Sequence, residues 1–324
     1  MRPFCYNVLR IYSFREMRRS MIKMKIVARP ALSVMILALL AITAGCSGKE
    51  ATAPKKDKLI VVTSIFPVAD IIRNVGGKRI EVIALVQPGQ SPHTYEPLPR
   101  EMELMSRADV FATVGFGLEF WADKMLANAQ NPKLIKLVYA DYVKPVGSAD
   151  EHEGKYNPHI WLSPKIAMVM AEKTRDALSR AMPAAAPEFA ANCEAYTKEL
   201  KRLDAWTISR LSKLKNRKFV SFHSAWDYLS RDYGIVQAGS IEEFPGKEPT
   251  PEKLARLVEE TRKLRVKTIF AEPQFNPKVA ETLANEAGVS VATLDPMGDP
   301  NTPDRNTYIK LMEYNIKSLE KALK

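Results

Sequence analysis

Short runs of aliphatic and β-branched residues alternate with helical patterns along most of this chain, starting at Leu59. Such runs predict strands when they are about four to eight residues long and turn residues flank them. Four of them lie in the first half of the chain, at 59–64, 79–86, 109–115 and 134–138. Helical spacing of apolar residues lies between them at 68–75 and 118–129. This order of elements predicts a parallel sheet with helices on its faces.

A second set of strand-like runs follows at 218–222, 235–241, 267–272 and 289–295. The helical patterns between the two sets are longer. Ser163 and Pro164 suit the N-cap and first position of a helix that would end near Met182. Residues 188–214 keep helical spacing without an interior Gly or Pro. This stretch predicts one helix of roughly 40 Å, or two shorter helices with a kink between them.

These elements predict an α/β fold with two lobes, each containing a parallel sheet flanked by helices, joined by a long rigid helix. We expect an N-terminal lobe at 58–182, a linking helix at 183–215 and a C-terminal lobe at 216–324. The composition agrees, because 324 residues with 46% hydrophobic and 26% charged side chains are typical of a globular protein. Disordered, collagen-like and coiled-coil chains are excluded.

Residues 1–45 have the pattern of a bacterial signal peptide. A basic stretch precedes fifteen uncharged residues at 31–45, fewer than the roughly 20 that a membrane-spanning helix needs. Cys46 follows two small residues, which resembles the cleavage and lipidation site of lipoproteins, although a plain signal peptide is the alternative. The polar stretch 46–57 predicts a flexible tether. We therefore expect an extracytoplasmic protein, anchored to the membrane by a lipid on Cys46.

Charge and cysteine content exclude several classes of function. The formal charge is +11, but residues 1–30 hold eight basic side chains against one acidic side chain, so the remainder carries only +4. The charge is thus poor evidence for a nucleic-acid partner, and we expect none. Of the three cysteines, only Cys193 lies within the mature domain. An intrachain disulfide or a cysteine-rich zinc site is therefore excluded there.

Three of the four histidines occupy similar places in the sequence. His93, His159 and His223 each lie in a loop or at a helix start, close behind a predicted strand or extended segment. A carboxylate, Asp295, ends the last predicted strand. Ligands of open α/β sheets bind at the carboxyl ends of strands, so residues far apart in the sequence can converge there. We expect these four side chains to share one cleft.

Three imidazoles and one carboxylate suit a first-row divalent cation, and zinc prefers four such ligands. The spacings of 66, 64 and 72 residues match no local zinc finger. Taken singly, each histidine is more simply a hydrogen-bonded or surface side chain, and Asp295 a turn or N-cap residue. The prediction of a metal site rests on the four together. For a metal bound by imidazoles, we expect affinity to fall as the pH drops through about 6.5.

Several longer segments carry a resemblance to a known family. They are VTSIFPVADIIRNVGG (62–77), PGQSPHTYEP (88–97), NPHIWLSP (157–164), FVSFHSAWDYLSRDYGI (219–235) and FAEPQFNPKVAETLANEAGVSVATLDPMG (270–298). In this order they resemble the zinc- and manganese-specific solute-binding lipoproteins of bacterial ABC transporters. The resemblance extends over about residues 58–324.

The resemblance implies two α/β lobes with a metal between them, bound by His93, His159, His223 and Asp295. It also implies a receptor rather than an enzyme, which passes a divalent metal to an ABC transporter permease. We expect a monomer. A histidine at the third ligand position is usual for zinc binders of this family, whereas manganese binders often carry a carboxylate there. We therefore expect Zn²⁺, with Mn²⁺ or iron as alternatives.

Other residues have predicted supporting roles. Glu272 is placed to bind a ligand imidazole from its strand end. Tyr95, Trp161 and Trp226 flank the ligands and would form dry walls of the cleft. Two further predictions concern single segments. Ser224 and Asp227 have capping-box spacing for the helix after His223. His152 lies in the acidic segment 147–157, which is either a weak metal-collecting loop or a solvated loop.

Two other functions compete with the receptor. A zinc hydrolase could use the three histidines, a water and Glu272 or Asp295 as a base, but the sequence contains no HExxH or GxSxG motif. A surface adhesin is the other alternative, a role claimed for some relatives of the family. No sequence feature supports or excludes it.

Overall fold

The computed structural model describes residues 57–147, 155–242 and 249–324. Asp57–Lys324 forms one compact unit. The predicted signal peptide 1–45, the lipidation site Cys46 and all but the last residue of the predicted tether lie outside the described residues, as does His152. Within the described ranges, no helix combines the length and the apolar character needed to cross a membrane.

The first sheet is parallel, with strand order β2-β1-β3-β4. Its strands are β1 (Leu59–Thr63), β2 (Ile80–Ala84), β3 (Val110–Thr113) and β4 (Ile135–Val138). Its helices are α2 (Phe66–Gly76), α3 (Pro99–Arg107) and α4 (Ala122–Ala129). All four predicted strands are confirmed, with somewhat shorter bounds. The helix α4 begins four residues later than the predicted 118–129, because Phe116 and Gly117 have positive φ angles of 52° and 89° that turn the chain first.

The second sheet repeats the same arrangement, with strand order β6-β5-β7-β8. Its strands are β5 (Lys218–Ser221), β6 (Val236–Ser240), β7 (Thr268–Ala271) and β8 (Ser290–Thr293). Its helices are α7 (Asp227–Tyr233), α8 (Pro251–Lys263) and α9 (Pro277–Ala287). The α/β fold with two parallel sheets is thus confirmed. In each sheet the strand order reverses at the centre, which is where sheets of this kind leave a crevice for a ligand.

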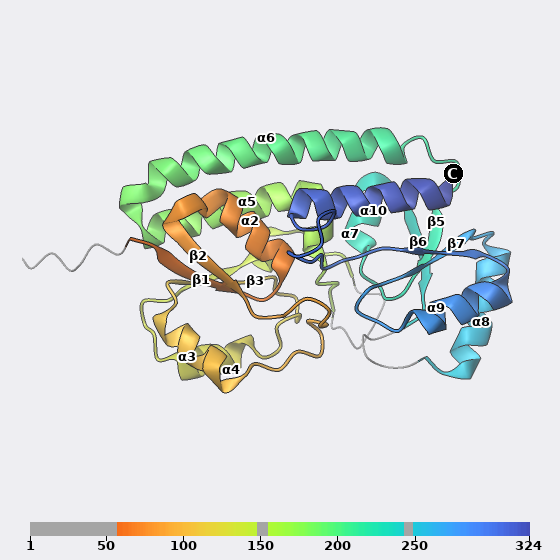
Figure 1. Cartoon of the computed structure of the whole chain (residues 1–324), viewed down its shortest axis with the longest axis horizontal. Coiled ribbons are helices and arrows are strands. Elements are labelled where there is room, and N and C mark those ends of the chain that lie inside the picture. Colours follow the sequence, from red (N-terminus) through yellow and green to blue (C-terminus); the bar gives the residue numbers. More distant parts are fainter. Residues whose placement is uncertain (1–56, 148–154, 243–248) are drawn as a thin grey trace, which may run out of the picture. The chain divides into compact units, whose positions relative to one another are not determined.

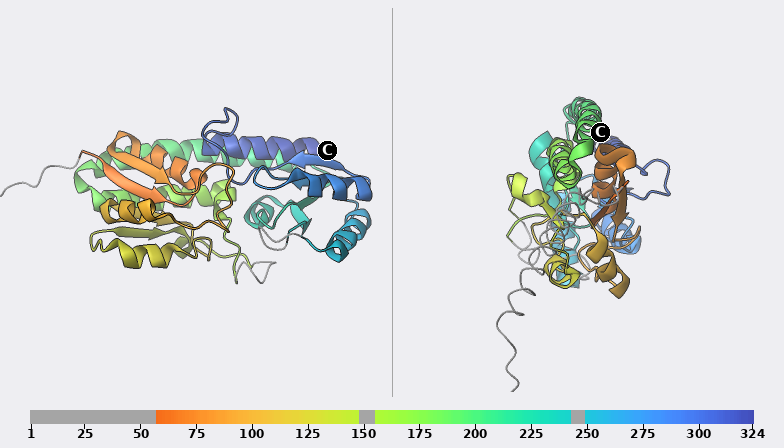
Figure 2. Two further views of the ribbon diagram at one scale, coloured as in Figure 1. Left: turned by 60° about the horizontal axis from the view of Figure 1, so that its bottom comes forward. Right: turned by 90° about the vertical axis from the view of Figure 1, so that its left-hand side faces the viewer.

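Three long helices lie beside the sheets: α5 (Pro164–Ala181), α6 (Ala186–Leu211) and α10 (Tyr308–Leu323). The helix α5 packs on the first sheet and α10 on the second, whereas α6 packs on helices of both halves. Figure 1 shows α6 passing over α2 and α5 beside the first sheet and then beside α10 near the second. Figure 2 shows the same pairing of α6 and α10 from another side. The 26 residues of α6 form one unbroken helix of about 39 Å, so the alternative of two kinked helices is wrong.

The buried face of α6 explains why this helix is continuous. Residues at three- and four-residue spacing point into the core, as in an amphipathic helix: Phe189, Cys193, Tyr196, Leu200, Leu203, Thr207 and Leu211. All of them except Thr207 belong to a hydrophobic cluster that also includes core residues of both sheets, such as Val62 and Phe270. The helix therefore joins the two halves through a continuous core.

Two predicted helix caps differ from the structure. Ser163 is the N-cap of α5, but its hydroxyl donates a hydrogen bond to Asp232 at 2.5 Å instead of capping the helix. Ser224 is not a cap, because α7 begins at Asp227 and its N-cap is Trp226. The Ser224 hydroxyl accepts a hydrogen bond from Gln237. In both cases the serine hydroxyl forms a hydrogen bond with a side chain of another segment. The local sequence does not reveal such a partner.

Buried polar contacts connect the start of α10 to the first half of the chain. The backbone N–H of Tyr308 donates to Asp70 Oδ2 on α2 at 2.8 Å, and the Tyr308 hydroxyl donates to the carbonyl of Trp161 at 2.7 Å. The indole of Trp161 donates in turn to the carbonyl of Pro296 at 2.7 Å. Because all three bonds are buried, they restrict how the segments can shift against each other.

We predict that Asp70→Ala lowers the free energy of unfolding by about 1–3 kcal/mol, because the buried N–H of Tyr308 loses its acceptor. Denaturation in urea measures this difference. The matched control is Asp176→Ala, which removes a carboxylate that is 45% exposed and paired with Arg175. The control should change stability by less than about 0.5 kcal/mol. Equal effects of both substitutions would contradict the prediction.

Candidate metal centre

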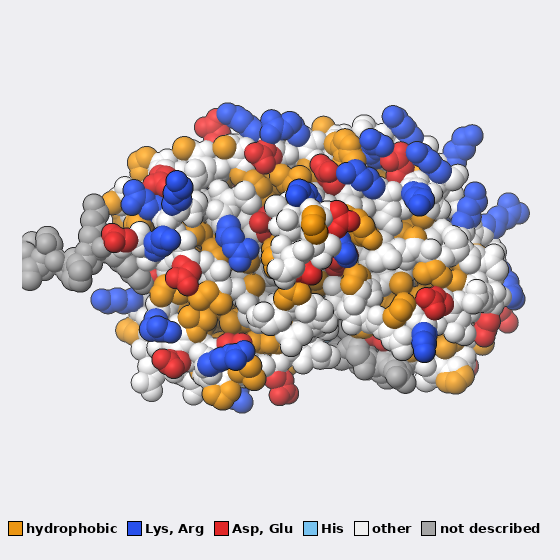
Figure 3. Space-filling model, viewed as in Figure 1, with side chains coloured by type: hydrophobic (Ala, Val, Ile, Leu, Met, Phe, Trp, Pro, Cys, Tyr) orange, Lys and Arg blue, Asp and Glu red, His pale blue; other side chains and the backbone are white. Residues whose placement is uncertain are grey.

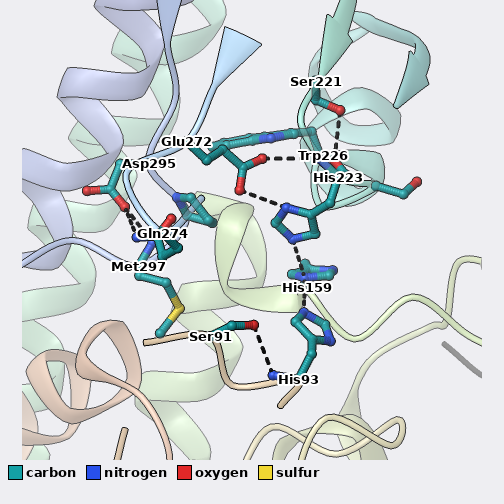
Figure 4. A network of polar contacts seen from close by, with 12 residues as sticks. Ser91, His93, His159, Ser221, His223, Trp226, Glu272, Gln274, Asp295 and Met297 are labelled. Atoms are coloured by element: carbon teal, nitrogen blue, oxygen red, sulfur yellow. Dashed lines mark hydrogen bonds and ion pairs between the residues drawn. The ribbon is translucent and has the colours of Figure 1, made fainter. Parts of the chain in front are cut away.

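The three predicted histidines converge although they come from three separate segments. His93 lies in the loop between β2 and α3. His159 precedes the short 3-10 helix Ile160–Leu162, just before α5. His223 is the second residue after β5. Figure 4 shows the three imidazoles in a row with His159 in the centre.

The distances between the imidazoles are those of a ligand cluster. His159 Nε2 is 3.0 Å from His93 Nε2 and 3.1 Å from His223 Nε2. Two nitrogens bound to one tetrahedral zinc ion, each at about 2.0–2.1 Å, lie about 3.3 Å apart. Among the described residues, these three histidines form the group of His, Cys, Asp or Glu whose ligand atoms all lie within 4.8 Å of one another.

The other ring nitrogen of two imidazoles faces an acceptor. His159 Nδ1 lies 2.8 Å from Asn157 Oδ1, and His223 Nδ1 lies 2.7 Å from Glu272 Oε2. Amide and carboxylate oxygens accept hydrogen bonds, so in the neutral rings the proton is assigned to Nδ1. Both Nε2 atoms then present lone pairs to each other. Lone pairs at this separation repel, and a cation between them turns the repulsion into binding.

Burial keeps two of the three imidazoles, those of His93 and His159, neutral. It lowers the pKa of His93 to about 3, with the nearby charge of His223 as a second cause. It also holds the pKa of His159 well below the ordinary value, again with His223 as the next cause. Neutral imidazoles are the form that binds metal. For His93 and His159 the lowered pKa values place proton competition below pH 6.5, whereas the expected loss of metal affinity near pH 6.5 stays a prediction.

A small cavity adjoins the imidazoles. Its volume is about 10 Å³, close to that of one water-sized sphere. Its lining comprises Ser91, Pro92, His93, His159, Trp161, His223, Glu272, Gln274, Phe275, Pro296 and Met297. The predicted wall position is confirmed for Trp161, whereas Tyr95 and Trp226 are buried outside this lining. No imidazole is visible on the face of the molecule that Figure 3 presents.

Asp295 is near the cavity but does not join the three imidazoles. Its Oδ1 accepts hydrogen bonds from Gln274 Nε2 and from the backbone N–H groups of Met297 and Gly298. Its Oδ2 pairs with Arg305 at 2.8 Å. Figure 4 shows the carboxylate apart from the imidazoles, with Gln274 beside it. Its role as a metal ligand stays a prediction.

Glu272 occupies the position expected of it, behind the His223 imidazole at the end of β7. Sequence reasoning missed Asn157, which is fully buried and whose Oδ1 also accepts from the backbone N–H of His159. Its amide donates to Ser224 O at 2.6 Å and to Asp227 Oδ2 at 2.9 Å. It therefore ties the loop of His159 to the segment after His223. An Asx contact two residues before a histidine is a signal that could have found it.

The chain is similar in sequence to known metal-binding proteins. The sequence matches the family described as zinc-uptake complex component A, periplasmic, over residues 61–322. The zinc-binding lipoprotein AdcA of Streptococcus pneumoniae serotype 4 is 32% identical over 279 residues, 82% of this chain and 56% of that protein. The manganese-binding lipoprotein MntA of Halalkalibacterium halodurans is 30% identical over 296 residues, 90% of this chain and 96% of that protein.

A solved structure supports the same relation. A crystal structure of ZnuA superposes with a TM-score of 0.74 at 30% sequence identity, covering 83% of this chain and 100% of that chain. The chain thus spans about half the length of AdcA but nearly all of MntA. Fold and sequence point to the same group of proteins.

We predict that Glu272→Gln weakens metal binding by about 10- to 100-fold, because the neutral amide supports the His223 imidazole less well than a carboxylate. Competition with a chromogenic chelator measures the dissociation constant. Glu281→Gln on the exposed face of α9 is the matched control and should leave it unchanged. An unaltered constant in Glu272→Gln would show that the contact does not orient the ligand.

We predict that the metal-free protein loses stability as the pH falls below about 6.5, the pKa of an unfolded histidine. The folded pKa of His93 is about 3, so between these values the unfolded chain binds more protons than the folded chain. Each such histidine should lower the free energy of unfolding by about 1.4 kcal/mol per pH unit in this window. Urea denaturation at pH 7 and pH 5 measures it. The double variant His93→Asn/His159→Asn should show a shallower dependence.

Proposed function

Because this chain belongs to the family of periplasmic zinc-uptake components, we propose that it is an extracytoplasmic receptor that captures a divalent metal and delivers it to an ABC transporter permease. The observation that carries the proposal is the convergence of three Nε2 atoms in one buried cluster. His93, His159 and His223 are the proposed ligands. The sequence-based assignment of Asp295 as a fourth ligand remains part of the proposal to be tested.

Zinc is the proposed cargo. Three imidazole nitrogens suit zinc, whereas manganese favours more oxygen ligands than this cluster supplies. Relatives named for zinc and for manganese are both similar to this chain, so manganese is the alternative. The two cases differ in donor chemistry, and a direct competition between the metals distinguishes them.

The protein acts as a binding protein and not as an enzyme, since its family consists of solute-binding receptors. The chemistry of the site agrees with this assignment. A hydrolase needs room for a substrate beside its metal-bound water. The cavity beside the histidines has a volume of only about 10 Å³, which admits an ion or one water.

The receptor works outside the cytoplasm, as its periplasmic family does. In our proposal a lipid on Cys46 attaches it to the membrane and residues 46–57 act as the tether. It acts as a monomer with the permease as its partner. This arrangement keeps the metal-binding unit Asp57–Lys324 close to the transporter that it serves.

The test is elemental analysis of purified protein without a histidine tag. The protein is stripped with a chelator and re-equilibrated with equimolar zinc, manganese and iron. We predict one zinc per chain, lost in His93→Ala/His159→Ala and retained in His152→Ala, which removes the fourth histidine of the chain.

If manganese or iron dominates, the protein is still a metal receptor, but the proposed choice of zinc is wrong. Without any stoichiometric metal, the proposal fails. Metal-independent binding to a host matrix protein would then support the adhesin alternative.

A further inference from the structure

Cations gather at one edge of the second sheet, the edge where its strands begin. The helices α6 and α8 end there because a strand follows each of them, and α10 ends there because the carbonyl of Ala322 accepts from Thr268 Oγ1 at 3.1 Å. Figure 3 shows Lys and Arg side chains around the end of the molecule where Figure 1 places the C-terminus. We call seven exposed cations of this region the basic edge: Lys213, Lys215, Lys218, Lys263, Arg265, Lys267 and Lys321.

The cations of the basic edge have no acidic partner. Among the residues that the structure describes, none of the seven forms an ion pair, whereas Arg210 and Lys324 nearby both pair with Glu320. Arg217 is also engaged, because its guanidinium donates to three backbone carbonyls. The whole chain after residue 30 carries a formal charge of only +4. The basic edge is therefore a local concentration of uncompensated positive charge.

Two of these lysines occupy matching positions on neighbouring strands. The strands β5 and β7 pair in parallel at Val220 and Ile269, and Lys218 and Lys267 each lie two residues earlier. Neighbouring strands lie about 4.8 Å apart, and like charges in opposite positions destabilise a sheet. An anionic partner bound at this edge would remove that cost.

Arg265 has an unfavourable backbone conformation. Its φ is +54°, in the left-handed region that favours Gly or Asn over Arg. It lies in the turn between α8 and β7, and its side chain is exposed. The chain thus places a cation at this edge at a conformational cost.

Helix ends explain only part of the basic edge. The helix macrodipole favours cations in the last turn of a helix, which accounts for Lys263 and Lys321. The other five cations lie beyond the helix ends, where this effect has faded. Another reason is needed for them.

The composition of the basic edge suits a broad anionic surface rather than a single small anion. Six of its seven members are lysines, whose ammonium groups act as point charges. Bidentate recognition of one phosphate or carboxylate group favours arginine instead. The cations also come from separate parts of the chain, namely the loop after α6, the start of β5, the α8–β7 turn and the end of α10. A membrane with anionic phospholipids offers a surface of this kind.

The position of the basic edge fits such a partner. The first strand after the expected tether, β1, lies at the left in Figure 1, and the basic edge lies at the right, near the C-terminus. The 12 residues of the expected tether reach about 40 Å when fully extended. A receptor held only by its tether is free to turn away from the membrane. A second contact at the far end keeps both sheets close to it.

We propose that the basic edge binds the headgroups of anionic phospholipids and gives the receptor a second attachment to the membrane beside the lipid on Cys46. The inference rests on the proposed function for the place of the protein outside the cytoplasm. It does not depend on the metal site.

The experiment measures sedimentation of the protein with lipid vesicles. Residues 47–324 are used, which carry no lipid and include the compact unit Asp57–Lys324. We predict binding to vesicles of equal parts phosphatidylglycerol and phosphatidylcholine, and none to phosphatidylcholine alone. Raising the salt from about 0.1 M to about 1 M should abolish binding, because the Debye length falls from about 10 Å to about 3 Å.

Two variants test the residues. Lys213→Gln/Lys215→Gln/Lys218→Gln should lower the vesicle affinity by about 100-fold, because each cation near an anionic membrane contributes about fivefold. Arg265→Asn should lower it by about fivefold without lowering the melting temperature, since Asn tolerates the left-handed conformation.

The matched control removes the same charge from the first half of the chain. Lys124→Gln/Lys133→Gln/Lys136→Gln changes three exposed lysines on or near α4 and β4 and should alter the vesicle affinity by less than about threefold. Thermal melting verifies that each variant folds. If the triple variant of the basic edge does not fold, Arg265→Asn still tests the inference.

Three results would overturn the inference. They are equal binding to phosphatidylcholine vesicles, an equal loss in the variants of the basic edge and the control, and displacement from vesicles by inorganic phosphate at matched ionic strength. The last result would make the basic edge a site for a soluble anion. Zinc binding, measured on the same samples, separates this inference from the receptor function. If the unaltered protein binds vesicles but no metal, the receptor fails and the membrane contact stands; if it binds metal but no vesicles, only the membrane contact fails.

Discussion

The proposed metal centre depends on one electrostatic constraint, the close approach of three imidazole nitrogens in a largely buried space. His159 Nε2 lies 3.0 Å from His93 Nε2 and 3.1 Å from His223 Nε2. Asn157 and Glu272 maintain this arrangement, because each faces Nδ1 of one ring and leaves its Nε2 unprotonated. Burial lowers the pKa of His93 and His159, so these two rings do not take up a proton near neutral pH that would relieve the repulsion between facing lone pairs. A divalent cation is the partner that relieves it best.

Such a cluster requires a scaffold that keeps three distant segments in place. The two sheets share one strand pattern, and the unbroken helix α6 contributes to a core that includes residues of both. Buried hydrogen bonds of Tyr308 with Asp70 and Trp161 further stabilise this scaffold. Asn157 makes the same kind of connection at the site itself, from the loop of His159 to the start of α7. The rigidity of the frame is therefore part of the binding chemistry.

The two carboxylates closest to this chemistry have different partners. Glu272 lies 2.7 Å from His223 Nδ1, so its charge supports a ligand. Asp295 lies 2.8 Å from Arg305, so its charge is compensated by a guanidinium. Residue type alone would assign both to the metal site. Their partners determine whether a carboxylate supports an imidazole or has its charge compensated by a guanidinium.

The sequence by itself determined the strands, the helical span of α6 and the placement of the three histidines, because hydrophobic periodicity and strand-end placement are local properties of the chain. Only the structure showed that α6 is unbroken. The sequence also indicated Glu272 as a partner of a ligand. Only the tertiary structure decided the partners of polar side chains. Ser224 lies before the N-cap of α7 and accepts a hydrogen bond from Gln237, and Asp295 pairs with Arg305 through a folded-back loop. Such pairings depend on which segments meet in space, and no local pattern encodes that.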